Sequence, residues 1–263
     1  YGAFIQGSQI QLDVTSENII PTLNTFNAIE PIKAWLFANS YLWNGQLDTL
    51  ISRDFFWEES MHGVFPENTG VFPETFDDPE TFLDYLTRTS HDEIPAFDLV
   101  GNDLVLTPSP FEFKTHRSYQ YQNLTTRGTV EFRSSCAQPI SSSFTVAAFH
   151  LGLMQELSAF EALIANHAFY EDYGRDYPKL RRRFSVPDLS SEELDDVTKF
   201  AKDLLDLATV GLEKRGFGEA KYLAALYQRV KTKENPAIKA LHLLEAGKTL
   251  SEISEIFADG KDI

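Results

Sequence analysis

The sequence predicts an α+β fold in which a sheet-bearing first part is followed by a mostly helical second part. Polar and apolar residues alternate over residues 4–14, and a second β-prone run covers residues 129–134. After Pro139 the apolar residues recur at helical spacing almost to the end. We therefore divide the chain into residues 1–140, which carry the sheet, and residues 141–263, whose helices pack on it.

The first strand is predicted from a run with one polar and one apolar face. Its polar positions are Gln9, Gln11 and Asp13, and its apolar positions are Ile10, Leu12 and Val14. A strand at the edge of a sheet normally needs a partner. We therefore expect a further strand beside this one, on a part of the protein outside these residues.

Helical and irregular segments are expected between the strands. Apolar residues on successive turns predict helices over about 16–27, 32–38 and 79–89. Residues 53–73 are rich in Pro, Gly and aromatic residues, which predicts a long functional loop. A short strand is expected over 103–107.

Helical periodicity fills the second part. One long apolar helix is predicted over 144–168. The sequence Ser190-Ser-Glu-Glu193 is a capping box, which opens a helix to about residue 210. The basic run Lys179–Arg183 is interpreted as a solvated connector. Shorter helices are expected over 219–231, 236–244 and 251–257.

Composition narrows the class of protein. With 263 residues, 43% of them hydrophobic, the chain is long and apolar enough for a substantial core. The net charge of −16 argues against nucleic-acid or acidic-membrane partners. No apolar run reaches the roughly 18 residues of a membrane span. Cys136 is the only cysteine, so an internal disulfide is impossible, and we expect a small buried side chain in a reducing cytoplasm.

The most informative motif is Arg127-Gly-Thr-Val-Glu131-Phe-Arg133. In a strand, Glu131 and Arg133 point to the same face, with Thr129 beside them. A carboxylate beside a guanidinium suits a site for Mg²⁺ and phosphate. The carboxylate is an anionic oxygen ligand for Mg²⁺, and the planar guanidinium can bind a phosphate at two points. The same spacing also occurs as a solvated ion pair on an ordinary strand, and from the spacing both interpretations stay open.

Five separated segments, taken in order, carry a resemblance to a known family. They are Gln9–Asp13, Pro31–Gly45, Ser52–Trp57 with Thr69-Gly70, Arg127–Arg133, and Gly211–Leu223 with Asn235-Pro236-Ala237. Together they resemble the glutamate–cysteine ligases, in particular the group that includes the plant enzymes. The resemblance implies that the strands form part of a glutamine-synthetase-like antiparallel sheet.

The resemblance also has two departures. Members of the family carry a strand with a Glu-x-Glu pair that helps to hold metal ions, before the segment that Gln9 begins. Residue 68 is asparagine where the family has an arginine. We therefore expect a second chain or an N-terminal segment to complete the sheet and the site.

The implied activity is ATP-dependent formation of γ-glutamylcysteine from glutamate and cysteine through a γ-glutamyl phosphate, the first step of glutathione synthesis. Glu131 would be a ligand of Mg²⁺, and Gln9 either a second ligand or a structural hydrogen-bond partner. Arg133 would neutralise charge on the transferred phosphate of ATP. Arg127 would support it or bind a substrate carboxylate.

The resemblance places the substrate around the first helices. Arg53 would bind the glutamate carboxylate, with a surface arginine as the alternative, while Trp57 shapes the pocket and Asn39 contacts substrate. Two other functions stay open for the chain. One alternative is a non-catalytic subunit or a fragment of such a ligase. The other is a related ligase with a different amine acceptor.

Overall fold

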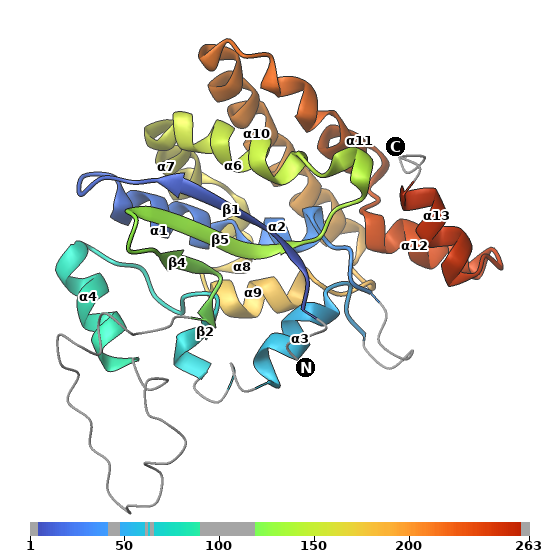
Figure 1. Ribbon diagram of the computed structural model, residues 1–263, viewed down its shortest axis with the longest axis horizontal. Helices are drawn as coiled ribbons and strands as arrows, with labels where there is room; N and C mark the ends of the chain where they lie inside the picture. Colours follow the sequence, from blue (N-terminus) through green and yellow to red (C-terminus); the bar gives the residue numbers. More distant parts are fainter. Residues whose placement is uncertain (1–4, 42–47, 61–62, 64–65, 90–118, 259–263) are drawn as a thin grey trace, which may run out of the picture.

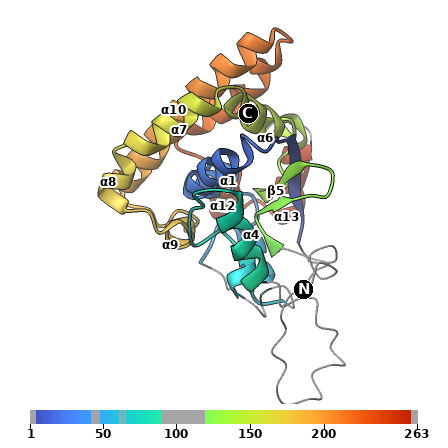
Figure 2. The same cartoon turned by 90° about the vertical axis from the view of Figure 1, so that its left-hand side faces the viewer.

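A small antiparallel sheet lies against a body of helices (Figure 1). The structure is a computed structural model that describes residues 5–41, 48–60, 63, 66–89 and 119–258. Figure 2, turned by 90°, shows β5 on the right and the helices α8, α9 and α10 on the left. This mixture of helices with an antiparallel sheet confirms the predicted α+β class.

The main sheet has the strand order β1-β5-β4 in the described part of the chain. Strand β1 (Gly7–Asp13) and strand β4 (Gln122–Leu124) both pair antiparallel with the central strand β5 (Thr129–Cys136). Two short strands, β2 (Thr69–Gly70) and β3 (Tyr119–Gln120), form a separate parallel pair. The strands predicted over 4–14 and 129–134 are confirmed by β1 and β5, although residue 4 lies outside the described residues, as does the strand predicted over 103–107.

The pairing of β1 with β5 contains a bulge. The register shifts between Ser8 and Ile10, so that two residues of β5, Arg133 and Ser134, oppose the single residue Gln9. Before the bulge, buried and half-buried side chains alternate along β5, as a regular strand requires. After it, the last three residues of β5 are all buried. The bulge therefore separates a polar-faced segment from a buried segment of one strand.

The helices of the first part cover the apolar face of the sheet, where the ring centroids of Phe26 and Phe132 lie 4.6 Å apart. The predicted helices over 16–27, 32–38 and 79–89 are confirmed. The predicted loop over 53–73 is wrong in part, because the aromatic residues at its start form a short helix that buries Phe56. These helices are α1 (Ile19–Ala28), α2 (Glu30–Leu36), α3 (Ser52–Glu58) and α4 (Pro79–Arg88), with the 3-10 helix η3 (Pro66–Asn68).

The second part is helical, as expected. Its elements are η6 (Ile140–Ser142), α6 (Thr145–Gln155), α7 (Leu157–Asn166), α8 (Phe169–Tyr173), α9 (Tyr177–Arg183), α10 (Ser191–Arg215), η7 (Glu219–Leu223), α11 (Ala224–Thr232), α12 (Pro236–Glu245) and α13 (Leu250–Ala258). The single helix predicted over 144–168 is wrong, because the backbone leaves helical geometry at Glu156 (φ −111°, ψ 32°). The capping box of Ser190 and Glu193 is confirmed by both of its hydrogen bonds.

Helices α6 and α10 pack closely through two glycines. A Cβ atom added to Gly152 would lie 2.3 Å from the carbonyl oxygen of Ala208, and one added to Gly211 would lie 2.1 Å from the carbonyl oxygen of Gly152. Real side chains do not approach backbone atoms this closely. Helix α10 runs past the predicted end near residue 210 to Arg215, and Gly211 lets this extension pack closely against α6.

One large apolar cluster joins the two parts of the chain. It contains Phe26 and Phe132 from residues 1–140 and Phe149, Phe160 and Phe200 from residues 141–263. The division at residue 140 stays a prediction. No helix among the described residues combines the length and the apolar character that a membrane span requires.

Candidate functional site

The polar face of the sheet brings together side chains from β1 and β5. Gln11 is the register partner of Glu131, and Asp13 is the partner of Thr129. Glu131 and Arg133 point to this face, with side-chain exposures of 14% and 15%. The alternation predicted for Glu131, Arg133 and Thr129 is confirmed by the structure.

Glu131 and Arg133 form an ion pair within β5. Nη2 of Arg133 lies 2.7 Å from Oε2 of Glu131, and Nε donates to the same oxygen at 2.8 Å. Both side chains are mostly shielded from water, so this pair is held more firmly than a fully solvated one. The arrangement places one carboxylate and one guanidinium side by side on the open face.

Arg127 joins this pair through Gln11. Nη2 of Arg127 donates to Oε1 of Gln11 at 2.9 Å, and Nε2 of Gln11 donates to Oε1 of Glu131 at 3.3 Å. Thr129 also donates to Oε1 of Gln11, at 3.2 Å. We call these five residues, Gln11, Arg127, Thr129, Glu131 and Arg133, the polar cluster.

Gln9 lies apart from Glu131, although it shares the exposed side of β1. The bulge places Gln9 opposite Arg133 and Ser134, while Gln11 takes the position beside Glu131. Gln11 therefore lies closer than Gln9 to a metal ion that Glu131 would bind. The role predicted for Gln9 as a metal ligand stays a prediction. Alternation along β1 alone does not distinguish the two glutamines, because it does not reveal the register.

Arg53 is buried at the end of the sheet, with 5% of its surface exposed. Its Nη1 donates to the carbonyl oxygen of Ser134 at 2.9 Å, while its buried Nε has no hydrogen-bond partner. A Cβ atom on Gly7 would lie 3.0 Å from its Nη2, so the missing side chain at that position makes room for the guanidinium. The alternative of a surface arginine is wrong.

Arg181 is the main residue that the sequence analysis missed. Its side chain is 3% exposed, so the interpretation of Lys179–Arg183 as a solvated connector is wrong at this position. Nε donates to Oδ2 of Asp54 at 2.8 Å, and Nη1 donates to Oε2 of Glu30 at 2.8 Å. Burial opposes the charged form of Arg181, but the carboxylates of Asp54 and Glu30 outweigh it and raise the pKa.

Besides Arg181, the carboxylate of Glu30 has a second cationic partner, Lys33. Both side chains are fully buried, and Nζ of Lys33 lies 2.6 Å from Oε1 of Glu30. Burial lowers the pKa of Lys33, while Glu30 opposes this shift. The hydroxyl of Ser134 donates to the same carboxylate at 3.0 Å. An acid and a base three residues apart in an otherwise apolar helix were the available sequence signal for this network.

Trp57 and Asn39 both hold backbone segments in place. Nε1 of Trp57 donates to the carbonyl oxygen of Tyr119 at 2.7 Å, and Nδ2 of Asn39 donates to that of Ala137 at 2.8 Å. Trp57 thereby ties α3 to β3, and Asn39 ties the end of α2 to the segment after β5. Their contacts with substrate stay predictions.

A pocket of about 540 Å³ opens beside Arg181, between α3, β2 and α9. Asp54, Glu58, Tyr121 and Arg182 also line it. Asp54 links this pocket to Arg53, because its Oδ1 lies 3.9 Å from Nη1 of Arg53. The pocket is therefore next to the end of the sheet where Arg53 is buried.

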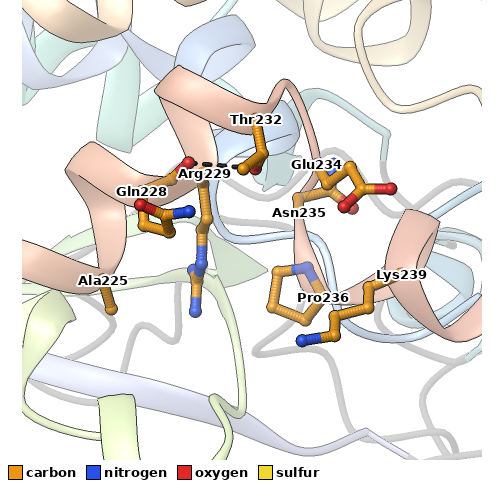
Figure 3. A pocket seen from close by; sticks show the side chains of 8 residues that line it. All are labelled: Ala225, Gln228, Arg229, Thr232, Glu234, Asn235, Pro236 and Lys239. Atoms are coloured by element: carbon orange, nitrogen blue, oxygen red, sulfur yellow. Dashed lines mark hydrogen bonds between the residues drawn. The ribbon is translucent and has the colours of Figure 1, made fainter. Parts of the chain in front are cut away.

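A much smaller pocket lies between α11 and α12 (Figure 3). Its volume is about 80 Å³, room for only a few water molecules of about 30 Å³ each. Arg229 donates to the carbonyl oxygen of Leu36 at 3.0 Å, and Asn235 donates to that of Trp35 at 2.8 Å. These bonds fasten α11 and α12 to α2, so we assign this pocket a structural role.

The polar cluster has the chemistry of a Mg²⁺ site but not a complete set of protein ligands. Glu131 offers carboxylate oxygens and Gln11 an amide oxygen, the hard donors that Mg²⁺ prefers, while Gln9, outside the cluster, carries a further amide. Within the described residues no group of three or more His, Cys, Asp or Glu side chains is placed to hold a metal. Mg²⁺ is commonly bound by one or two carboxylates together with substrate phosphates and water, so the donors present fit this ion.

Comparison with known proteins shows the class to which this chain belongs. The family model of glutamate–cysteine ligase family 2 matches residues 4–252, so the chain is a member of that family. This confirms the resemblance carried by the five sequence segments. The family consists of ligases, and the polar cluster lies on the strand that the resemblance identified.

The chain is similar to plant members of the family. It is 25% identical to the chloroplastic glutamate–cysteine ligase of Arabidopsis thaliana over 273 residues, which cover 94% of this chain and 51% of that protein. The enzymes of Medicago truncatula and Solanum lycopersicum are 24% and 26% identical, with 52% and 51% of their lengths covered and 95% of this chain in both cases. The chain thus spans about half the length of the curated relatives it matches.

Proposed function

We propose that the protein is an ATP-dependent carboxylate–amine ligase that forms γ-glutamylcysteine through a γ-glutamyl phosphate. The observation that carries this proposal is the polar cluster, with the buried and incompletely paired Arg53 at the end of the same sheet. A fold related to glutamine synthetase is part of the proposal. It is supported by the antiparallel order β1-β5-β4 with helices on the apolar face.

The arginines supply the positive charge that phosphoryl transfer requires. Arg133 and Arg127 lie at the two ends of the polar cluster, so negative charge placed over it would meet a guanidinium on either side. Arg133 would exchange part of its contact with Glu131 for the transferred phosphate. Arg53 would bind the carboxylate of glutamate, because its free Nε can take part in a two-point contact with a carboxylate.

ATP and Mg²⁺ are the proposed cofactors. Glu131 would be the protein carboxylate on the metal, with Gln11 or Gln9 nearby as an amide donor. When bound, Mg²⁺ would screen the charge of the nucleotide phosphates. The further acidic strand expected from the family would come from an N-terminal segment or a second chain beside β1. We also keep the cytoplasm as the proposed compartment, although the plant relatives are named chloroplastic.

A non-catalytic subunit is the second candidate function. It is favoured by the ion pair between Glu131 and Arg133, because a carboxylate already neutralised by a neighbour needs no metal. The buried Nε of Arg53 argues against it, because leaving a guanidinium N–H buried without an acceptor destabilises a protein that has no ligand for it.

Phosphate release separates the two candidates. The chain, alone and together with any polypeptide that copurifies with it, is supplied with ATP, Mg²⁺, glutamate and cysteine. A ligase releases phosphate only when glutamate is present. Glu131→Gln should lower this rate at least tenfold, whereas Glu17→Gln, an exposed carboxylate just beyond β1, should not change it.

Two results would count against the proposal. Glutamate-dependent release that survives Glu131→Gln removes the role given to Glu131. A complete lack of glutamate-dependent release in every mixture favours the non-catalytic subunit instead.

A further inference from the structure

Ser134 is held by charged side chains through both its carbonyl and its hydroxyl. The carbonyl oxygen accepts hydrogen bonds from Nη1 of Arg53 at 2.9 Å and from Nη2 of Arg181 at 3.1 Å. The hydroxyl donates to Oε1 of Glu30 at 3.0 Å. Ser134 is 2% exposed, so water competes little for these bonds. Hydrogen bonds to ionised groups are stronger than those between neutral groups, and Ser134 has three of them.

The three partners of Ser134 come from three different helices. Glu30 lies on α2, Arg53 on α3 and Arg181 on α9. Two of them are also bound to each other, because Nη1 of Arg181 donates to Oε2 of Glu30 at 2.8 Å. A displacement of Ser134 would break buried, charge-assisted bonds to all three helices. The helices therefore fix this point of β5.

These contacts fall in the bulge of β5, where the sheet holds the strand less firmly. Arg133 and Ser134 together oppose Gln9 there. A bulge locally disrupts the ladder of hydrogen bonds between two strands. The N–H of Arg133 still donates to the carbonyl oxygen of Tyr121 at 2.8 Å. The bonds from the helices to Ser134 therefore replace part of the support that a regular ladder gives.

Arg133 lies directly before this fixed point. Its Nε and Nη2 contact Oε2 of Glu131 at 2.8 and 2.7 Å. In the proposed reaction the guanidinium exchanges part of this contact for the transferred phosphate, so its side chain loses a partner during the step. A misplacement of about 1 Å can lower the rate of such a step roughly a hundredfold. The backbone of Arg133 therefore needs an anchor that takes no part in the reaction.

We propose that Ser134 is a positioning residue, whose hydroxyl bond to Glu30 fixes the backbone from which Arg133 reaches the transferred phosphate. This inference rests on the proposed ligase function. Ser134 touches neither ATP nor glutamate and acts through Arg133. Its carbonyl also ties it to Arg53, the proposed site of the glutamate carboxylate. Ser134 thus sets the distance between the arginine for the carboxylate and the arginine for the phosphate.

Ser134→Ala removes the hydroxyl and leaves the carbonyl oxygen in place. Phosphate release is measured with ATP, Mg²⁺, glutamate and cysteine, on the chain together with any polypeptide that copurifies with it. We expect kcat to fall about tenfold or more while KM for ATP changes less than about threefold, because a positioning effect acts mainly in the transition state. An unchanged kcat would overturn the proposal.

Ser135→Ala is the matched control. Ser135 is the next residue of β5 and is also 2% exposed. The hydrogen bonds from Arg53 and Arg181 and the bond to Glu30 end on Ser134, so this variant removes a buried hydroxyl without touching them. It should leave kcat within experimental error. An equal fall of kcat in Ser134→Ala and Ser135→Ala would overturn the proposal.

Ser134→Thr separates positioning from stability. It keeps the hydroxyl but adds a methyl group at a buried position, and such overpacking lowers stability. The midpoint of urea unfolding should therefore fall below that of the wild type in both Ser134→Thr and Ser134→Ala. Only Ser134→Ala should lose kcat, because Ser134→Thr can still donate to Glu30. A kcat that instead follows the urea midpoint through all the variants would show a structural role and overturn the proposal.

A spectroscopic measurement tests the proposal without activity. The Nε–H of Arg133, which donates to Glu131, gives an NMR signal in protein labelled with ¹⁵N-arginine, and its loss in Arg133→Lys identifies it. This signal should move and broaden in Ser134→Ala and stay in place in Ser135→Ala. If the wild type releases no phosphate with glutamate, the proposed ligase function fails. The NMR signal then decides alone whether Ser134 positions Arg133, and a signal unmoved in Ser134→Ala overturns the proposal.

Discussion

The guanidinium groups of Arg53 and Arg181 donate hydrogen bonds to one backbone oxygen, that of Ser134, at 2.9 and 3.1 Å. Arg53 comes from α3 and Arg181 from α9, so two helices distant in sequence meet at the end of β5. Ser134 directly follows Arg133, the proposed phosphate-binding arginine. The position of Arg133 therefore depends on a charged network beneath the sheet.

Loss of Arg181 should strongly destabilise the protein. Arg181→Met leaves the buried carboxylate of Glu30 with Lys33 as its basic partner. The same change removes the arginine that donates a hydrogen bond to Asp54. Removing one partner of a buried ion pair typically costs about 3–5 kcal/mol, which we expect in the free energy of unfolding measured with urea. Arg182→Met is the control, because that side chain is 71% exposed and pairs only loosely with Glu58. A loss below about 1 kcal/mol for Arg181→Met would show that Arg181 does not hold Glu30 and Asp54 as these contacts indicate.

The buried imidazole of His150 should make stability depend on pH. Its Nδ1 bonds to the carbonyl oxygen of Val146 at 2.8 Å, and its buried Nε2 has no partner. Burial, and then the charge of Lys33, hold the pKa of His150 well below its usual 6.5. As the pH falls below about 6.5, the unfolded chain takes up a proton that the folded protein does not. The free energy of unfolding should therefore fall by up to about 1.4 kcal/mol per pH unit.

His150→Leu tests the origin of this slope. Urea unfolding at pH 7.5, 6.5 and 5.5 should show a shallower loss of stability on acidification in this variant than in the wild type. His242→Gln, which removes an exposed imidazole, gives the comparison for a surface site. An unchanged slope in His150→Leu would mean that other groups cause the acid sensitivity.

The glycine contact between α6 and α10 should not accept even a methyl group. Gly211→Ala places a Cβ atom 2.1 Å from the carbonyl oxygen of Gly152, so the helices must move apart. Overpacking of this kind costs about 1–3 kcal/mol, to be measured as the change in the free energy of unfolding. Ser158→Ala, at an exposed position of α7, is the control and should change stability by less than about 0.5 kcal/mol. Equal stability of the two variants would show that the helices separate without cost.

Gly7→Ala should shift the guanidinium of Arg53 while leaving the arginine itself in place. The new Cβ atom would lie 3.0 Å from Nη2 of Arg53 and 2.8 Å from the carbonyl oxygen of Ser135. If Arg53 binds the glutamate carboxylate, KM for glutamate in phosphate release should rise about tenfold while kcat changes less. Gln6→Ala, an exposed change one residue earlier, should leave KM unchanged. A loss of stability with an unaltered KM would remove Arg53 from the substrate site.

Some parts of the site were predictable because they depend on local geometry alone. Glu131 and Arg133 are two residues apart in one strand, so their common face followed from alternation. The Ser190 capping box followed in the same way from its four-residue spacing.

Other parts depend on contacts that no local pattern reveals. Gln11 rather than Gln9 meets Glu131, because the register is set by the pairing of β1 with β5, a strand more than 100 residues later. Arg181 belongs to a basic run that looks exposed, yet Glu30 and Asp54 neutralise it in the interior. The helix α3 was hidden because three consecutive aromatic residues, of which only Phe56 is buried, show no helical spacing of apolar residues.

Because of the bulge at Arg133 and Ser134, the number of residues in β5 decides which of its side chains face the polar side of the sheet. Upstream of it, the odd-numbered positions face the polar side of the sheet, and downstream every residue belongs to the interior. A deletion of one residue between Arg127 and Ser134 would turn Glu131 inward and Phe132 outward, or would erase the bulge and draw the buried serines into solvent. The spacing of this strand is therefore as tightly constrained as the identity of its charged residues, and natural variation here should consist of substitutions without insertions or deletions.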